Sequence, residues 1–123
     1  MPLWGRVGVG GVQPFSPLRE TGNLVAFSGQ VGERDGQLVA GGFVPELNQA
    51  LANLGRLIKG AGLSPTDVIK TNVYLANIAD WAQLNEPYMR FFGDPLPART
   101  ALAVAALPLG ARVEIEAWAV RPG

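Results

Sequence analysis

The chain has 123 residues, 48% of them hydrophobic and 16% charged, and its ten basic residues balance its ten acidic ones. It contains no cysteine and no histidine, which excludes disulfides, thiolate nucleophiles, Ser-His-Asp triads and nearly all zinc sites. A net charge of zero also argues against nucleic acid as a partner, because a binder must replace the counterions of the phosphate backbone. We expect a single domain over residues 1–123 whose chemistry comes from the remaining polar side chains, the backbone and water.

The first third of the chain predicts short strands joined by turns. Glycine and proline dominate the first twenty residues, which predict a loop with an edge strand near Arg6–Val9. The apolar run Leu24–Ser28 is typical of a buried strand. Val31–Val39 predicts a hairpin that turns at Arg34–Gly36, since Asp-Gly tolerates the positive φ of such turns.

A helix, a strand and a second helix follow. Apolar residues recur at helical spacing from Glu46 to Lys59, and Pro45 suits a first helical turn. The β-branched and aromatic segment Val68–Leu75 predicts a strand. Asp80 is a candidate N-cap for the second helix, in which Pro87 predicts a kink or a break. The apolar stripe of that helix consists of Trp81, Leu84, Tyr88 and Phe91.

Two strands, Thr100–Leu107 and Arg112–Val120, close the chain. The order of elements predicts an α+β sandwich with two helices packed on one face of a mixed β-sheet. Because Ala101–Leu107 is apolar at every position, we expect it to be buried on both faces. The face without helices would then expose an apolar patch, so we predict an oligomer, whose number of subunits does not follow from this argument.

The sequence gives no indication of a membrane or of secretion. The longest apolar run, Ala101–Leu109, is too short to span a bilayer, and the N-terminus lacks the charged-then-apolar order of a signal peptide. We therefore expect a cytoplasmic protein.

A series of short motifs is more specific than the composition. The motifs are Phe27–Gly32, Asn53, Ile58, Ala61–Leu63, Asp67–Leu75, Asn85, Tyr88, Phe91, Phe92, Pro97–Thr100 and Val113–Ala117. Any one of them is a weak signal, but their order and spacing resemble the family of reactive-intermediate imine/enamine deaminases (RidA), which also carries the older name endoribonuclease L-PSP. The resemblance runs from about Gly22 to Arg121.

The resemblance implies a chorismate-mutase-like fold and a homotrimer with a central β-barrel. It also implies three active sites, each in a cleft between neighbouring subunits. The substrate would be a short 2-imino acid or its enamine tautomer. Water would add to the C=N carbon, giving a 2-keto acid and ammonia without a metal or cofactor.

Arg99 and Glu114 are the candidate catalytic residues. Arg99 follows Pro97-Ala98 at the mouth of a strand, and a guanidinium can hold a carboxylate by two parallel hydrogen bonds. An arginine in that position is in general a solvated charge, but the Pro-Ala-Arg-Thr setting favours a function. The resemblance implies that Glu114 holds and activates the attacking water. A solvated or intersubunit ion pair is the alternative, and we favour it for Glu116 on the same strand face.

The resemblance also implies a set of substrate-binding residues. Backbone groups around Ser28 and Gly29 would line the substrate, and Asn85 would build the neighbouring wall, although a structural hydrogen bond explains Asn85 equally well. Where the family commonly has a tyrosine, this chain has Phe15, which lacks the hydroxyl but can still close an apolar pocket. Ala101 stands where the family often has cysteine.

Two other functions stay open. Phe15 leaves room for a non-catalytic trimeric module that binds small carboxylates. An endoribonuclease, the activity in the older family name, is argued against by the neutral charge and the lack of histidine. We assign the aromatic residues Trp81, Tyr88, Phe91 and Phe92 to packing in the core or an interface.

Overall fold

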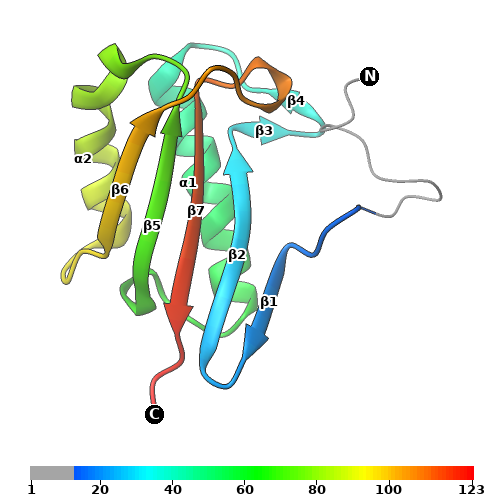
Figure 1. The fold of residues 1–123 in the computed structure, drawn as a ribbon, viewed down its shortest axis with the longest axis vertical. Helices are drawn as coiled ribbons and strands as arrows, with labels where there is room; N and C mark the ends of the chain where they lie inside the picture. Colours follow the sequence, from blue (N-terminus) through cyan, green and yellow to red (C-terminus); the bar gives the residue numbers. More distant parts are fainter. Residues whose placement is uncertain (1–12) are drawn as a thin grey trace.

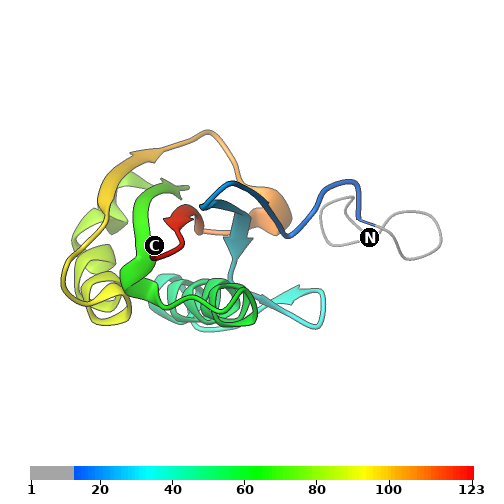
Figure 2. The ribbon, with the colours of Figure 1, turned by 90° about the horizontal axis from the view of Figure 1, so that it is seen from below.

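Two layers make up the structure, a computed structural model that describes residues 13–123. Two α-helices lie against one face of a five-stranded sheet, as Figures 1 and 2 show in two perpendicular views. The helices are α1 (Phe43–Gly60) and α2 (Trp81–Phe92). The strands of this sheet are β1 (Leu18–Thr21), β2 (Leu24–Val31), β5 (Val68–Leu75), β6 (Ala98–Ala103) and β7 (Val113–Val120). The predicted α+β arrangement is confirmed.

The order of strands, β1-β2-β7-β5-β6, places α2 beside one edge of the sheet. β5 and β6 run parallel, whereas the other neighbouring strands are antiparallel. A parallel pair needs a crossover connection, and α2 supplies it between β5 and β6. Side chains of β6 that point toward the helix layer therefore meet α2.

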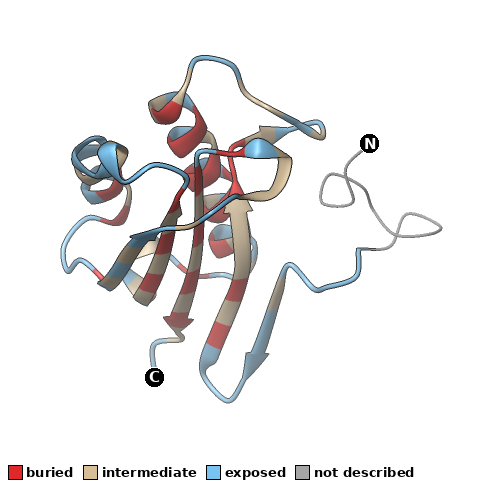
Figure 3. Ribbon diagram, turned by 45° about the horizontal axis from the view of Figure 1, so that its top comes forward, coloured by how far each residue is buried: buried red, intermediate tan, exposed pale blue. Residues whose placement is uncertain are grey.

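Side chains alternate between the two faces of the sheet. Buried and partly exposed residues follow one another along β7, and Figure 3 shows this banding on the central strands. The odd-numbered residues from Val113 to Ala119 are buried in the core, whereas Glu114 and Glu116 are partly exposed. Because successive side chains of a strand point to opposite faces, both glutamates lie on the face that carries no helix, here called the open face.

The hairpin and the first helix follow the predicted pattern with shifted ends. β3 (Glu33–Arg34) and β4 (Gln37–Leu38) form the predicted hairpin, and Asp35 and Gly36 at its turn have φ values of 57° and 83°. α1 begins at Phe43 rather than Glu46, because the first turn of a helix tolerates Pro45. The sequence does not predict β1. The strand expected near Arg6–Val9 lies outside the described residues.

The strand expected at Thr100–Leu107 is wrong in its bounds, whereas burial of Ala101–Leu107 on both faces, expected only within an oligomer, stays a prediction. β6 ends at Ala103, and Leu102 is 40% exposed. β6 is an edge strand with only β5 beside it. An edge strand lacks a neighbour on one side, so its apolar composition does not by itself bury it.

The open face also differs from the expected apolar patch. Asn72 and Tyr74 of β5 form hydrogen bonds with Glu116 there, and Lys70 bonds to Thr100 of β6. The middle of this face is therefore polar. The polar middle of this face gives no support to an oligomer formed through an apolar patch, and the oligomer stays a prediction.

α2 continues through Pro87 without a break. A proline inside a helix removes one backbone hydrogen bond, but Leu84, Tyr88 and Phe92 anchor this helix in the core. Asp80 occupies the predicted N-cap position, yet its carboxylate accepts a hydrogen bond from the Gln83 side chain rather than from a backbone N–H.

Within residues 13–123, no helix combines the length and the apolar character needed to cross a membrane.

Candidate active site

Arg99 lies on the helix side of β6, where α2 fixes its guanidinium. Its register partner on β5 is Thr71, which is fully buried beneath the helices. Arg99 Nη2 donates a hydrogen bond of 2.9 Å to Asn85 Oδ1. The guanidinium carbon also lies 4.9 Å from the ring centre of Tyr88 and 5.5 Å from that of Trp81. A guanidinium at these distances is attracted to the ring faces.

Trp81, Asn85 and Tyr88 form one surface of α2 around this guanidinium. Their spacing of four and three residues places them on the same helix face. The sequence predicts only a packing role for Trp81 and Tyr88, and their contact with Arg99 is an addition from the structure. The spacing of Trp81, Asn85 and Tyr88 in the sequence could have indicated this surface, since Asn85 lies between the two aromatic residues on the same helix face.

Tyr88, one of the two rings beside Arg99, is itself held in place by the core. It is 2% exposed, and its hydroxyl bonds to Thr71 on β5. Burial raises the pKa of Tyr88, although the Thr71 hydrogen bond and the Arg99 charge act against this rise. The phenol therefore stays neutral, and its ring offers an uncharged face to the guanidinium.

Among the acceptors of residues 13–123, only Asn85 receives a hydrogen bond from Arg99. A guanidinium carries five N–H donors. The remaining donors can bind a carboxylate, and the two rings and the amide already restrict the orientation in which they do so.

Glu114 lies on the open face, paired with Tyr74 of β5 and Val31 of β2 in the two strand ladders. Burial raises the pKa of Glu114, and the nearby Glu116 charge raises it further. No side chain or backbone group within the described residues donates a hydrogen bond to this carboxyl. Glu114 is thus a half-buried acid with a raised proton affinity and open acceptor atoms.

Gly29 makes room for the Glu114 carboxyl. A side-chain carbon built on Gly29 would overlap Glu114 Oε2 and lie 3.0 Å from its carboxyl carbon. β2 shifts register against β7 between Phe27 and Gln30, so Gly29 sits at an irregularity in the ladder. Such irregularities re-aim the chain next to functional groups.

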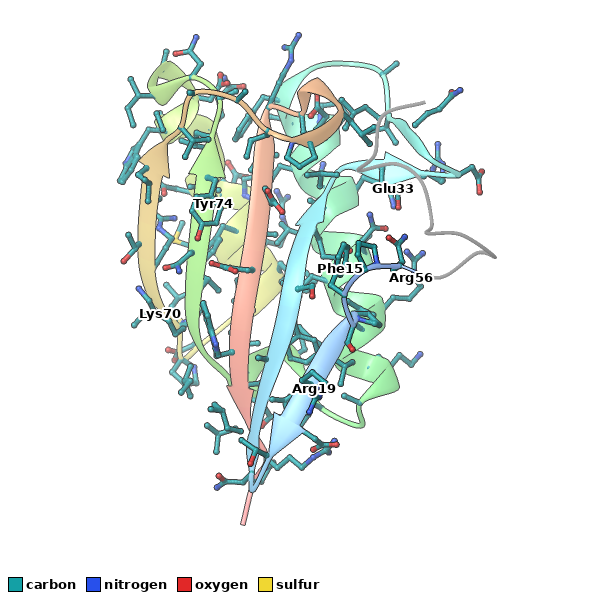
Figure 4. The ribbon with its side chains drawn as sticks, turned by 45° about the vertical axis from the view of Figure 1, so that its right-hand side comes forward. Phe15, Arg19, Glu33, Arg56, Lys70 and Tyr74 are labelled. Atoms are coloured by element: carbon teal, nitrogen blue, oxygen red, sulfur yellow. The ribbon has the colours of Figure 1, made fainter. Side chains whose placement is uncertain are left out.

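Ser28 ties the segment before β1 to this irregularity. Its hydroxyl donates to the Ser16 carbonyl at 2.6 Å, and its backbone N–H donates to the Pro17 carbonyl at 2.9 Å. Phe15 therefore lies next to a fixed part of the chain, and its side chain is 43% exposed. Figure 4 shows Phe15 beside Arg56 of α1, away from Lys70 and Tyr74 on β5.

Phe15 lines two hollows of the surface. The first, of about 470 Å³, also contacts Gly29, Asn53 and Arg56. The second, of about 510 Å³, lies over the open face and contacts Ser28 and Glu116. Neither hollow is lined by Arg99 or Asn85.

The predicted site residues thus fall into two groups within one chain. Phe15, Ser28, Gly29 and Glu114 gather around β2 and β7, whereas Arg99 and Asn85 lie at the β6 edge. Arg99 and Glu114 point to opposite faces of the sheet. Neighbouring strands lie about 4.8 Å apart, so β2 and β6 are separated by roughly 14 Å across β7 and β5.

Residues 13–123 contain no cluster of three or more histidine, cysteine, aspartate or glutamate side chains that could hold a metal ion. The expectation that the chemistry needs no cofactor stays a prediction.

Comparison with known proteins gives consistent results. The family described as Endoribonuclease L-PSP matches residues 9–121. The mouse protein named 2-iminobutanoate/2-iminopropanoate deaminase is 48% identical over 89% of this chain and 83% of its own. The human protein of that name is 45% identical over 91% and 83%. A solved structure from Thermotoga maritima superimposes with a TM-score of 0.87 at 36% identity, covering 96% of this chain and 92% of that one.

Proposed function

This chain belongs to the endoribonuclease L-PSP family, as the motif resemblance indicated, and we propose that it is a 2-iminobutanoate/2-iminopropanoate deaminase. It hydrolyses short 2-imino acids and their enamine tautomers to 2-keto acids and ammonia. The observation that carries this proposal is the position of the Arg99 guanidinium, which is fixed by Asn85 and two aromatic rings. Its remaining N–H groups can donate to a substrate carboxylate.

Arg99 binds the carboxylate that lies next to the reacting carbon of such a substrate. A guanidinium that grips a carboxylate with two parallel hydrogen bonds fixes its orientation as well as its position. The Asn85 bond and the ring contacts reduce the freedom that Arg99 loses on binding. Orientation of this kind contributes much of the rate when water attacks a neighbouring carbon.

Glu114 positions the water and moves its protons. The water oxygen bonds to the imine carbon, and a proton passes to the nitrogen. The C–N bond of the resulting carbinolamine then breaks, its electron pair leaves with ammonia, and the hydroxyl proton is lost as the keto group forms. A positioned acid–base group contributes about 10²–10⁴-fold to such steps.

The complete site needs two copies of the chain. Arg99 on β6 and Glu114 on β7 lie on opposite faces, and two strand spacings separate β6 from β7 by roughly 10 Å. A substrate with three or four carbons is too short to bridge that gap. We therefore place Arg99 and Asn85 of one subunit against Phe15, Ser28, Gly29 and Glu114 of a neighbour. The homotrimer with a central β-barrel, implied by the family resemblance, meets this need.

The remaining parts of the proposal follow from the chemistry. Hydrolysis of C=N needs only water, so no cofactor is required. The chain has no cysteine and therefore no disulfide, which suits the reducing cytoplasm. We propose that it acts there as a single-domain enzyme over residues 1–123.

An imine-decay assay tests the activity. A dehydratase or amino-acid oxidase generates 2-iminopropanoate or 2-iminobutanoate in place, and the protein should accelerate the loss of imine above the rate in buffer. Arg99→Ala should lose that acceleration by at least about 100-fold, because the carboxylate loses its orienting partner. Arg99→Lys should lose most of it, since an ammonium lacks the two-pronged geometry.

Arg90→Ala is the matched control. Arg90 lies on α2 as a solvated cation paired with Glu86, with 68% of its side chain exposed. This variant should retain the wild-type rate. A fully active Arg99→Ala would contradict the role assigned to Arg99, and a wild type no faster than buffer would contradict the activity.

A trimeric binding module for small carboxylates is the second candidate, and Phe15 favours it because the tyrosine hydroxyl common in the family is missing. Calorimetry with 2-ketobutyrate separates the two: binding without imine turnover selects the module. Ribonuclease activity has less support, because the chain has zero net charge and no histidine.

A further inference from the structure

Two glutamates of β7 on the open face have very different surroundings. Glu116 Oε1 accepts hydrogen bonds from the Tyr74 hydroxyl and, at 3.1 Å, from Asn72 Nδ2. Glu114, two residues earlier, receives none from residues 13–123. One carboxylate is fixed by the protein, and the other is left for water or a ligand. A solvated or intersubunit ion pair is the role expected for Glu116 from the sequence, but within the described chain its partners are a phenol and an amide.

The donors of Glu116 come from β5, directly beside β7. Asn72 is the register partner of Glu116, and Tyr74 is the register partner of Glu114. The Tyr74 side chain thus leans along the strands to reach the second glutamate. Figure 4 shows Tyr74 on β5, where it projects from the sheet. The hydrogen bond to Glu116 is the largest cause of the raised pKa of Tyr74, so the phenol keeps its proton and remains a donor.

Within the described residues, none of the three cations named next forms a hydrogen bond or ion pair with Glu114. Lys70 of β5 donates to Thr100 Oγ1 at 2.7 Å. Arg19 of β1 lines the second hollow together with Glu116 and not with Glu114. Arg112, the residue before β7, pairs with Glu46 of α1. Burial and Glu116 alone account for the raised pKa of Glu114.

We propose that Glu116, held by Tyr74 and Asn72, is a positioning residue that keeps a negative charge beside Glu114 and so lets Glu114 carry a proton to the departing ammonia. This inference rests on the proposed deaminase function and adds a residue to it. The Glu114 carboxyl gives its proton to the amine nitrogen of the carbinolamine as the C–N bond breaks. The carboxylate that remains takes the hydroxyl proton when the keto group forms, which restores the acid.

The pH dependence of kcat/KM tests the proposal, with Glu116→Gln as the main variant. Glutamine keeps the size and the acceptor for Tyr74 but removes the charge. Without that charge Glu114 loses its proton more readily, so the basic limb of the profile, where Glu114 no longer holds the proton that it must donate, should move to lower pH. At the same time kcat should fall roughly tenfold, a part of the contribution of a positioned acid–base group.

Three further variants separate positioning from mere support of the fold. Tyr74→Phe keeps the ring but removes the hydroxyl that donates to Glu116, so it should shift the same limb of the pH profile in the same direction by a smaller amount. If Glu116→Gln fails to fold, this variant provides the test. Glu116→Asp keeps the charge and should restore much of the wild-type limb. Glu86→Gln removes an exposed carboxylate of α2, 85% exposed, and should leave the profile unchanged. A folded Glu116→Gln protein with an unmoved limb would overturn the proposal.

A direct titration makes this test independent of turnover. Carbon-13 NMR of the glutamate carboxyl groups, assigned with Glu114→Gln, follows the protonation of Glu114 in the unliganded full-length protein. The midpoint should be lower in Glu116→Gln than in the wild type. An equal midpoint in both proteins refutes the Glu116 inference even if the enzyme is active. A wild type that shows no imine turnover refutes the deaminase function, and the catalytic role of Glu116 with it.

Discussion

At the scale of single residues, the candidate site depends on the absence of a side chain as much as on the charged groups. Glu114 keeps its position because Gly29 opposite has no Cβ. Arg99 keeps its position because Asn85 and two rings surround it. The Glu114 half of the site thus depends on the space left by Gly29, and the Arg99 half depends on contacts with α2. The two halves should respond differently to substitution.

Gly29→Ala should lower kcat/KM by about tenfold or more, because a methyl group there overlaps Glu114 Oε2 and displaces the carboxyl from its place. The measurement is the imine-decay rate of the folded variant. Gly60→Ala is the control: Gly60 ends α1 with open space around it, so that variant should keep full activity. Equal activity in both variants would show that the Glu114 position does not matter.

Glu114→Gln should stabilise the protein at neutral pH while it removes activity. The folded-state pKa of Glu114 is raised, so its contribution to stability is present at low pH and is lost as pH rises through the raised value. Glutamine avoids that loss. Thermal unfolding should show a Tm about 2–4 °C higher than wild type at pH 7, a small gain because partial exposure screens the charge. The difference should vanish below about pH 4, and a lower Tm at pH 7 would contradict the assignment.

At the scale of elements, α1 holds the end of β2 through one buried amide. Asn53 is 3% exposed, and its Nδ2 donates to the carbonyls of Val31 and Glu33 at 3.0 and 2.9 Å. These two carbonyls lie where β2 passes into the β3–β4 hairpin. Gly29 and Phe15 share the adjacent hollow with Asn53, so this amide connects the helix layer to one half of the candidate site.

Asn53→Ala should lower the free energy of unfolding by about 2–3 kcal/mol, because the buried carbonyl of Val31 and the partly buried carbonyl of Glu33 lose their donor. Urea denaturation gives the value. Asn48→Ala on the same helix is the matched control: Asn48 is exposed, and its loss should change the free energy by no more than about 0.5 kcal/mol. Similar values for the two variants would show that the buried amide contributes nothing special.

For the molecule as a whole, the two halves of the candidate site lie on opposite faces of one sheet, and the proposed function requires a neighbouring copy to bring them together. Each chain would present the Arg99 half at its β6 edge and the Glu114 half over β2 and β7. In a closed ring every subunit gives one half to each neighbour. Substitutions in the two halves should therefore complement one another.

A mixture of Arg99→Ala and Glu114→Ala proteins, unfolded and refolded together, should recover activity that neither has alone. In a ring with random mixing, about one quarter of the interfaces combine an intact Arg99 half with an intact Glu114 half. The imine-decay rate of the mixture should approach that fraction of wild type. Sedimentation should show one assembly size throughout. A mixture as inactive as its components would mean that both residues act within one chain.

The sequence alone predicts the order of the two helices and of the strands other than β1, as well as the Asp35-Gly36 turn, the two-layer arrangement and the family. Local chemistry carries these features: periodic apolar residues, a dipeptide that accepts positive φ, and motifs in a fixed order. The identity of Arg99, Asn85 and Glu114 as candidates came from the same source, through the resemblance.

The face that each candidate occupies, and the groups that surround it, depend on how distant segments come together in the fold. Trp81 and Tyr88 beside Arg99, Tyr74 and Asn72 beside Glu116, and the polar open face all depend on segments far apart in the chain. The edge position of β6 and the existence of β1 do so as well. A strand's neighbours are set by hydrogen bonds to distant strands, so its own composition cannot tell whether an apolar run is central or at an edge.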